Sequence, residues 1–219
     1  MPPAHGTEKG EFSASFNQQS SGGRRPLRSE AEHRLISRVV KLLPAIRASV
    51  DAGKVDELVL SDVVEFFSSF TDRFHHAEEE GLFFPALQQR GVSPPGCPVG
   101  ALRLEHQQGR SLMNRMNAAT KRHSEGDVEG AKVISEVLGS AAELYAGHIW
   151  REEYLLFPMS EKVLSVQDRE ALAKDFHGVQ ERFSSRFLER YASLVEKLEK
   201  RVGQAPAQVA APRGATVSS

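Results

Sequence analysis

The chain has 219 residues, with 28 Lys and Arg, 29 Asp and Glu and a formal net charge of −1, so it fits one domain with tails. This near-neutral charge, without long blocks of one sign, argues against a nucleic-acid or anionic-membrane surface as the main activity. Cys97 is the only cysteine, which excludes a disulfide framework, a Cys-rich zinc site and an iron–sulfur cluster within one chain.

The sequence shows neither a signal peptide nor a membrane span. The N-terminal residues MPPAHGTEKGEFSASF lack the apolar core of a signal peptide. No stretch approaches the roughly 20 apolar residues that cross a bilayer. We therefore expect a soluble, cytoplasmic protein that binds neither a membrane nor nucleic acid.

The apolar pattern predicts five helices between two polar tails. Residues 1–28 are rich in Gly, Ser, Gln and Pro and are expected to form a disordered leader. The Ala/Pro/Ser-rich residues 203–219 are expected to form a disordered tail. Between them, apolar residues recur at intervals of three and four, as is typical of helices. The predicted helices cover residues 29–51, 56–90, 98–123, 127–163 and 167–202.

The connections between these helices predict an all-α, up-down-up-down four-helix bundle. Loops of about four to nine residues make consecutive helices antiparallel. We expect the bundle to span residues 29–164, and residues 165–202 to form an additional C-terminal helix packed on it. We interpret the apolar stripe of this helix as core, with a homodimer face as the alternative. The stripe comprises Leu172, Phe176, Val179, Phe183, Phe187, Tyr191, Leu194 and Leu198.

Two segments of the predicted bundle resemble one another. Residues 75–85 read HHAEEEGLFFP and residues 148–158 read HIWREEYLLFP, an offset of 73 residues. The same offset places the dipeptide Glu-His at 32–33 over the same dipeptide at 105–106. The bundle therefore consists of two similar helix pairs, and each pair supplies an E-H motif and an H-x3-E-E motif.

The repeated polar residues are predicted to meet at one level of the bundle. In each H-x3-E motif the two side chains lie one turn apart on the same face of the helix. The histidines of the E-H motifs lie at a similar depth, roughly 27 Å from the connecting loop at about 1.5 Å per residue. The candidate metal ligands are His33, His75, Glu79, His106, His148 and Glu152.

Two buried carboxylates among neutral imidazoles need compensating positive charge. Burying an ionised Glu without a partner costs on the order of several kcal/mol, and the repeat places no Lys or Arg at the equivalent positions. Two divalent metal ions would supply the charge, and imidazole with carboxylate suits iron, zinc or manganese. A ferritin-like site is the nearest alternative, but such a site uses E-x-x-H, whereas this sequence has H-x3-E.

Four blocks of the sequence resemble the hemerythrin-like HHE cation-binding family. They read EHRLISRV, FHHAEEEGLFFPAL, LEHQQGR and GHIWREEYLLFP, and together they cover about residues 29–160. The resemblance implies a non-haem di-iron centre inside a hemerythrin-like four-helix bundle. The implied cofactor is two iron ions, with zinc and manganese as alternatives.

The resemblance also implies a role for each candidate ligand. Glu79 and Glu152 would bridge the metals. The terminal ligands, one pair to each metal, would be His33 with His75, and His106 with His148. Oxygen-carrying hemerythrins place a further histidine one turn after the histidine of the third helix, and here that position is Arg110. Each metal would therefore keep open coordination positions.

Open positions on such metals admit water, O2, peroxide or NO. We therefore expect redox or sensing chemistry in a stress response, with a small diatomic or peroxide ligand and an electron donor that the sequence does not identify. The alternatives are an iron or oxygen sensor or carrier without turnover, and the repair of damaged iron centres. Residues 1–28 contain no cysteine, which weakens the repair role. Whether the protein is an enzyme stays open.

Several residues beside the candidate ligands have no assigned role in the metal site. His76 is expected outside the ligand set, because its counterpart is Ile149 and it lies about 100° around an α-helix from His75. Glu80 and Glu153 either orient ligands or belong to solvated helix faces. Arg110 either guards the entrance and pairs with a carboxylate, or is a plain surface residue.

Overall fold

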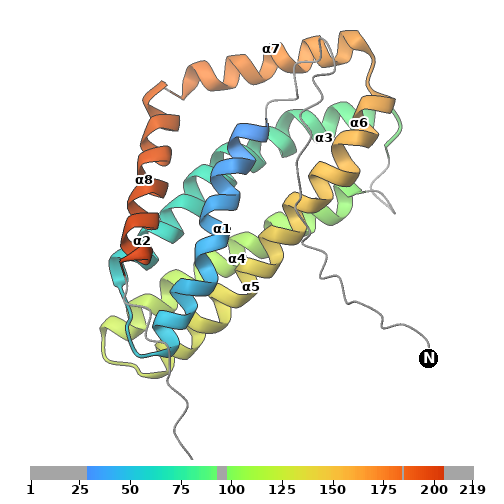
Figure 1. Ribbon diagram of the computed structural model, residues 1–219. Helices are drawn as coiled ribbons and strands as arrows, with labels where there is room; N and C mark the ends of the chain where they lie inside the picture. Colours follow the sequence, from blue (N-terminus) through green and yellow to red (C-terminus); the bar gives the residue numbers. More distant parts are fainter. Residues whose placement is uncertain (1–28, 93–97, 184, 205–219) are drawn as a thin grey trace, which may run out of the picture.

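The computed structural model describes residues 29–92, 98–183 and 185–204, and every regular element in these ranges is helical. Figure 1 shows how the helices are arranged. The elements are α1 (Ser29–Asp51), α2 (Glu57–Glu65), η1 (Phe66–His76), η2 (Glu79–Phe83), α3 (Phe84–Gln89), α4 (Pro98–Ser124), α5 (Glu129–Arg151), η3 (Glu152–Leu156), α6 (Phe157–Val163), α7 (Val166–Arg182) and α8 (Ser185–Gly203).

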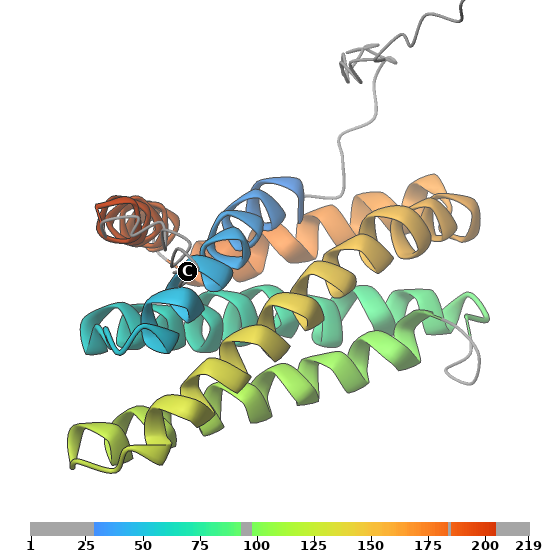
Figure 2. The same cartoon turned by 60° about the horizontal axis from the view of Figure 1, so that its bottom comes forward.

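Four long helical rods form the bundle, which confirms the predicted all-α fold (Figures 1 and 2). The first and third rods are α1 and α4. The second runs from α2 through η1 and η2 to α3, and the fourth runs from α5 through η3 to α6. Gly53, Gly91 and Gly126 have φ values of 73°, 86° and 93° at the ends of the first three rods. This left-handed conformation is the one in which glycine commonly ends a helix.

The second and fourth rods widen into π-helix at equivalent places. Both η2 and η3 begin at the glutamate of an H-x3-E motif. The N–H of Phe84 donates to the carbonyl oxygen of Glu79, five residues earlier. Phe157 makes the same bond to Glu152. A proline follows each phenylalanine. Because its ring crowds the carbonyl four residues before it and it has no N–H, a wider turn at this point relieves the conflict.

Two hydrophobic clusters fill the bundle and leave a polar layer between them. Along the second rod, the larger cluster ends at Phe74 and the smaller cluster begins at Phe83. Along the fourth rod, the larger cluster reaches Tyr145 and Ile149, on either side of His148 in the sequence, and the smaller one begins at Leu156. The candidate ligands of both H-x3-E motifs therefore lie in a layer with packed apolar side chains above and below it.

The C-terminal segment differs from the single helix predicted for residues 167–202. It forms two helices that meet at Phe183, whose backbone is extended (φ −92°, ψ 113°). In Figure 1, α7 crosses one end of the bundle and α8 runs along α1 and α2. The single apolar stripe serves both clusters, because Leu172 packs in the smaller one and Tyr191 in the larger one. A straight helix could not contact both.

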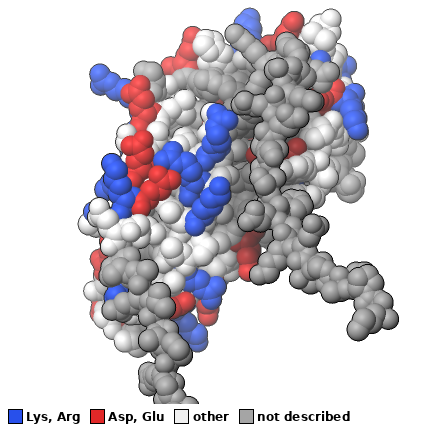
Figure 3. Space-filling view, viewed as in Figure 1, with Lys and Arg blue, Asp and Glu red and all other residues white. Residues whose placement is uncertain are grey.

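The predicted leader, residues 1–28, lies outside the described residues, and so does all of the predicted tail except residues 203 and 204. None of the helices that the structure describes combines the length and the apolarity needed to cross a membrane. On the face shown in Figure 3, basic and acidic side chains are interspersed over the described part of the surface.

Candidate metal centre

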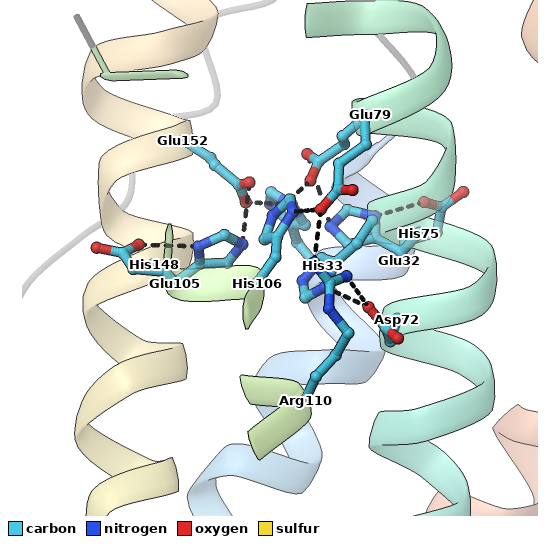
Figure 4. Close-up of polar contacts among 12 residues, drawn as sticks. Glu32, His33, Asp72, His75, Glu79, Glu105, His106, Arg110, His148 and Glu152 are labelled. Carbon is cyan, nitrogen blue, oxygen red and sulfur yellow. Dashed lines mark hydrogen bonds and ion pairs between the residues drawn. The ribbon is translucent and has the colours of Figure 1, made fainter. Parts of the chain in front are cut away.

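Seven buried His and Glu side chains of the described residues form two overlapping groups, and within each group the ligand atoms lie within 4.8 Å of one another. All six residues predicted from the sequence belong to them, and they come from all four rods (Figure 4). The first group is His33, His75, Glu79 and Glu152. The second group is His76, Glu79, His106 and His148.

Each inner carboxylate lies between one imidazole of the first group and one of the second. Glu152 has its two oxygens 3.1 Å from Nε2 of His33 and 3.1 Å from Nε2 of His148. Glu79 has its oxygens 3.8 Å from Nε2 of His75 and 3.3 Å from Nε2 of His106. A carboxylate placed in this way can give one oxygen to each of two metals.

The atoms that face the middle of the cluster are buried and have no hydrogen-bond partner. They are Nε2 of His33, His75, His76, His106 and His148, and both carboxylate oxygens of Glu79 and Glu152. Buried polar atoms without a partner cost free energy, and native proteins leave few of them. A metal ion accepts nitrogen and oxygen lone pairs together, so it satisfies this donor set in a way that no hydrogen bond here does.

The glutamates of the two E-H motifs accept hydrogen bonds from the outer ring nitrogen, Nδ1, of the histidines of the H-x3-E motifs. His75 Nδ1 lies 2.9 Å from Glu32 Oε2, and His148 Nδ1 lies 3.0 Å from Glu105 Oε2. Because a carboxylate accepts, Nδ1 carries a proton, and in the neutral imidazole that binds metal the Nε2 lone pair is then directed inward. The repeat contained this pair of glutamates, but the sequence alone did not show that each one bonds to a histidine on the next rod.

The second glutamates of the H-x3-E-E motifs hold the remaining two histidines. Glu80 Oε1 lies 2.7 Å from Nδ1 of His106, and Glu153 Oε1 lies 3.4 Å from Nδ1 of His33. Of the two roles left open by the sequence, these contacts favour orientation of the ligands. Both glutamates are also partly exposed, so each one joins the cluster to the surface.

In the absence of metal, the buried carboxylates favour the protonated form of two histidines of the cluster. Burial alone would lower the pKa of His75, but the Glu79 charge and the hydrogen bond to Glu32 outweigh it and raise the pKa to about 9. Burial opposes protonation of His148 as well, yet Glu152 and Glu105 raise its pKa to about 10. Burial would raise the pKa of Glu152, but His148 and His33 hold it well below its usual range.

The structure differs from the sequence-based expectation for His76, which lies inside the second group rather than on another face. Its side chain is 2% exposed, and its ring stacks on that of His106 with centroids 3.7 Å apart. The expectation assumed an α-helix, but residues 66–76 form the π-helix η1. A π-helix bonds i to i+5, so its turn contains more residues and neighbouring side chains are separated by a smaller angle.

Arg110 pairs with carboxylates at the edge of the cluster, so it is more than a plain surface residue. It donates to Asp72 Oδ1 at 2.7 Å (Figure 4). It also donates to Glu80 Oε1 at 3.2 Å. Its side chain is partly exposed. Arg110 therefore connects α4 to the second rod beside the histidines of the second group.

Replacing Glu32 with alanine is expected to weaken metal binding by about 10–100-fold, because loss of an outer partner lets the His75 ring turn and lowers its basicity. Competition between the protein and a chromophoric chelator measures the affinity. Glu136→Ala, an exposed glutamate on α5, is the control and should bind metal like the wild type. Equal affinities in Glu32→Ala and Glu136→Ala would contradict an orienting role for Glu32.

Comparisons with known proteins agree with this site. A family model described as the hemerythrin HHE cation-binding domain matches residues 30–160 and, a second time, residues 97–207. Three proteins described as uncharacterized, one from Mycobacterium bovis and two from strains of Mycobacterium tuberculosis, are each 25% identical over 174 residues. These alignments cover 78% of this chain and 68% of each relative. No solved structure matches the chain significantly.

Proposed function

The chain belongs to the hemerythrin HHE cation-binding domain family, and from this premise we propose that its His/Glu cluster binds two iron ions. This non-haem di-iron centre would bind or react with O2, peroxide or NO. The proposal makes the protein a redox or stress-response protein, whose electron donor would be a separate partner.

One observation carries the proposal: the inward imidazole and carboxylate atoms are buried and face one another, without a hydrogen bond of good geometry to any group outside the cluster. Four imidazole nitrogens converge on two carboxylates, and outer carboxylates hold the opposite nitrogen of each ring. A hydrophobic core or a plain ion-pair network would not need this directed arrangement. It is the arrangement that metal-binding histidines have in proteins.

The donor types support iron. Imidazole and carboxylate together suit iron, zinc and manganese, and the absence of thiolate ligands removes the preference for softer metals. Iron bound in this way supplies redox chemistry with small oxygen or nitrogen species. The residues of the chain hold the ions, fix the direction of each imidazole and separate the centre from bulk water.

The burial of the site supports a small reactant. Both inner carboxylates and all the histidines of the two groups are 5% exposed or less. Apolar clusters close the layer from both sides along the bundle axis. A diatomic molecule or peroxide fits such a site, whereas an extended organic substrate would require the bundle to open.

Metal analysis of the purified protein tests the proposal. We expect iron near two per chain and a visible ligand-to-iron charge-transfer absorption in aerobic protein. Protein that contains no metal, or zinc alone after expression with iron present, would exclude a di-iron centre. Stopped-flow mixing with peroxide, O2 and NO then separates the candidate roles: turnover indicates an enzyme, and a stable reversible adduct indicates a sensor or carrier.

A further inference from the structure

His76 has the surroundings of a metal ligand, and its described contacts include ring stacking but no hydrogen bond. It is 2% exposed, and neither of its ring nitrogens has a hydrogen-bond partner. It shares the second group with Glu79, His106 and His148. A histidine kept for packing alone would leave two buried nitrogens unsatisfied, at a cost that an apolar ring would avoid.

Three imidazoles surround one side of the centre. The ring of His76 lies 3.7 Å from that of His106 and 5.1 Å from that of His148, measured between centroids. The rings of His106 and His148 are 4.9 Å apart. The carboxylate of Glu79 lies beside the same three rings, with a ligand atom within 4.8 Å of a nitrogen of each. A single ion among them could therefore receive three nitrogens and an oxygen.

The ring of His76 is also oriented like those of the other four histidines, because a carboxylate lies beside Nδ1 and Nε2 makes no hydrogen bond. Its Nδ1 lies 3.6 Å from Asp72 Oδ1, one turn earlier on the same rod. Asp72 is held in place by Arg110, which donates to it at 2.7 Å. The same guanidinium binds Glu80, the outer partner of His106. Arg110 thus fixes both carboxylates behind the paired rings.

We propose that His76 is a ligand of the metal held by His106 and His148, an inference that rests on the proposed metal-binding function. The two metals are then inequivalent: the second group supplies three imidazoles, whereas the first supplies two. The repeat provides no equivalent in the first group, since the counterpart of His76 is Ile149. With both inner carboxylates bridging, the metal of the second group would have five protein ligands and that of the first group four, so small reactants would meet more open positions at the first.

The test compares wild-type protein with His76→Phe and His76→Asn. Phenylalanine keeps an aromatic ring against His106 without any nitrogen, and asparagine keeps a polar group near Asp72 without Nε2. Anaerobic titration of the full chain with Fe²⁺ gives the stoichiometry and affinity of both ions. Mössbauer spectra of protein loaded with ⁵⁷Fe report each iron separately. His177→Ala removes an exposed histidine and is the control.

We expect two distinct iron environments in the wild type and in the control. In both His76 variants the ion held by His106 and His148 should bind at least about 100-fold more weakly. Loss of an outer partner alone would weaken binding by only about 10–100-fold. At saturating iron only one of the two Mössbauer components should change. Circular dichroism of the metal-free variants checks that the bundle is folded.

The outcomes separate this inference from the proposed function. If the wild type binds two irons and His76→Phe and His76→Asn bind both with unchanged affinity and spectra, His76 is a packing residue and the inference is wrong. If the wild type binds no iron, the proposed function itself fails. Should one variant not fold, the affinity and spectra of the other decide.

Discussion

Glu152→Ala is expected to abolish the binding of both metals. The two oxygens of Glu152 face His33 of the first group and His148 of the second, so the substitution removes the carboxylate that would bridge the two metals. It also leaves two buried imidazoles without their counter-charge, and breaking a buried pair of this kind costs about 3–5 kcal/mol. Iron per chain and the thermal midpoint of the metal-free protein measure the two effects.

The neighbouring residue offers a matched control. Glu153 lies next in the chain, is 45% exposed and faces the outer nitrogen of His33, not the nitrogen that faces Glu152. Glu153→Ala should keep two irons per chain, with affinity lowered by no more than about 10–100-fold. Two tightly bound irons in Glu152→Ala would refute the bridging position of Glu152. By the repeat, Glu79→Ala should behave like Glu152→Ala.

Removal of metal should make the stability of the protein strongly dependent on pH on the alkaline side. His75 and His148 have folded-state pKa values of about 9 and about 10, above the ordinary value of 6.5. At pH values between the ordinary pKa of 6.5 and these raised pKa values, the folded chain binds more protons than the unfolded chain. The stabilisation from these two groups is therefore complete below pH 6.5 and is lost as the pH rises through 9 and 10.

Metal reverses this dependence. The ions need neutral imidazole, so loading releases the protons and binding tightens as the pH rises. The thermal midpoint of chelated protein should fall by roughly 5 °C or more between pH 6.5 and pH 9, given about 2–4 °C per kcal/mol for a chain of this size. Over the same pH interval, the thermal midpoint of the metal-loaded protein should exceed that of the chelated protein by an increasing amount. Parallel curves with and without chelator would contradict the exchange of protons for metal.

The six candidate ligands could be placed together from the sequence because their pattern recurs in the repeat, and the structure brings all six into the two groups. An isolated histidine in HHAEEEGLFFP carries little information, but a residue that recurs 73 positions later on a rod of similar length must lie at the same level of the bundle. Helix position was equally accessible, because it depends on apolar periodicity and on terminal glycines, which are local features. The predicted first helix, residues 29–51, coincides with α1.

The sequence repeat contains the outer carboxylates, but it does not show which histidine each of them bonds to. Glu32 and Glu105 recur with the repeat, yet each bonds to a histidine 43 residues away on the next rod. Which side chain meets which across two helices depends on the rotation of each rod about its axis. Apolar periodicity determines that rotation only coarsely, so the hydrogen bonds required the three-dimensional structure.

The position of His76 and the corner at Phe183 depended on departures from a regular α-helix. Both predictions continued a periodic pattern through a point where the backbone changes, to π-helix in η1 and to extended backbone at Phe183. Tertiary packing determines such changes. The aromatic residues of η1 pack against α8, where Phe70 and Phe74 contact Phe187. No short-range sequence signal reports that contact.

The wide helical turns make the two halves of the bundle alike at the glutamates and unlike at the histidines. η2 and η3 begin at corresponding glutamates, so Glu79 and Glu152 occupy matching places in the two repeats. η1 has no counterpart, because the corresponding stretch lies within the regular helix α5. The inequality of the two groups therefore originates in the helix geometry of the second rod, where η1 brings His76 into the second group.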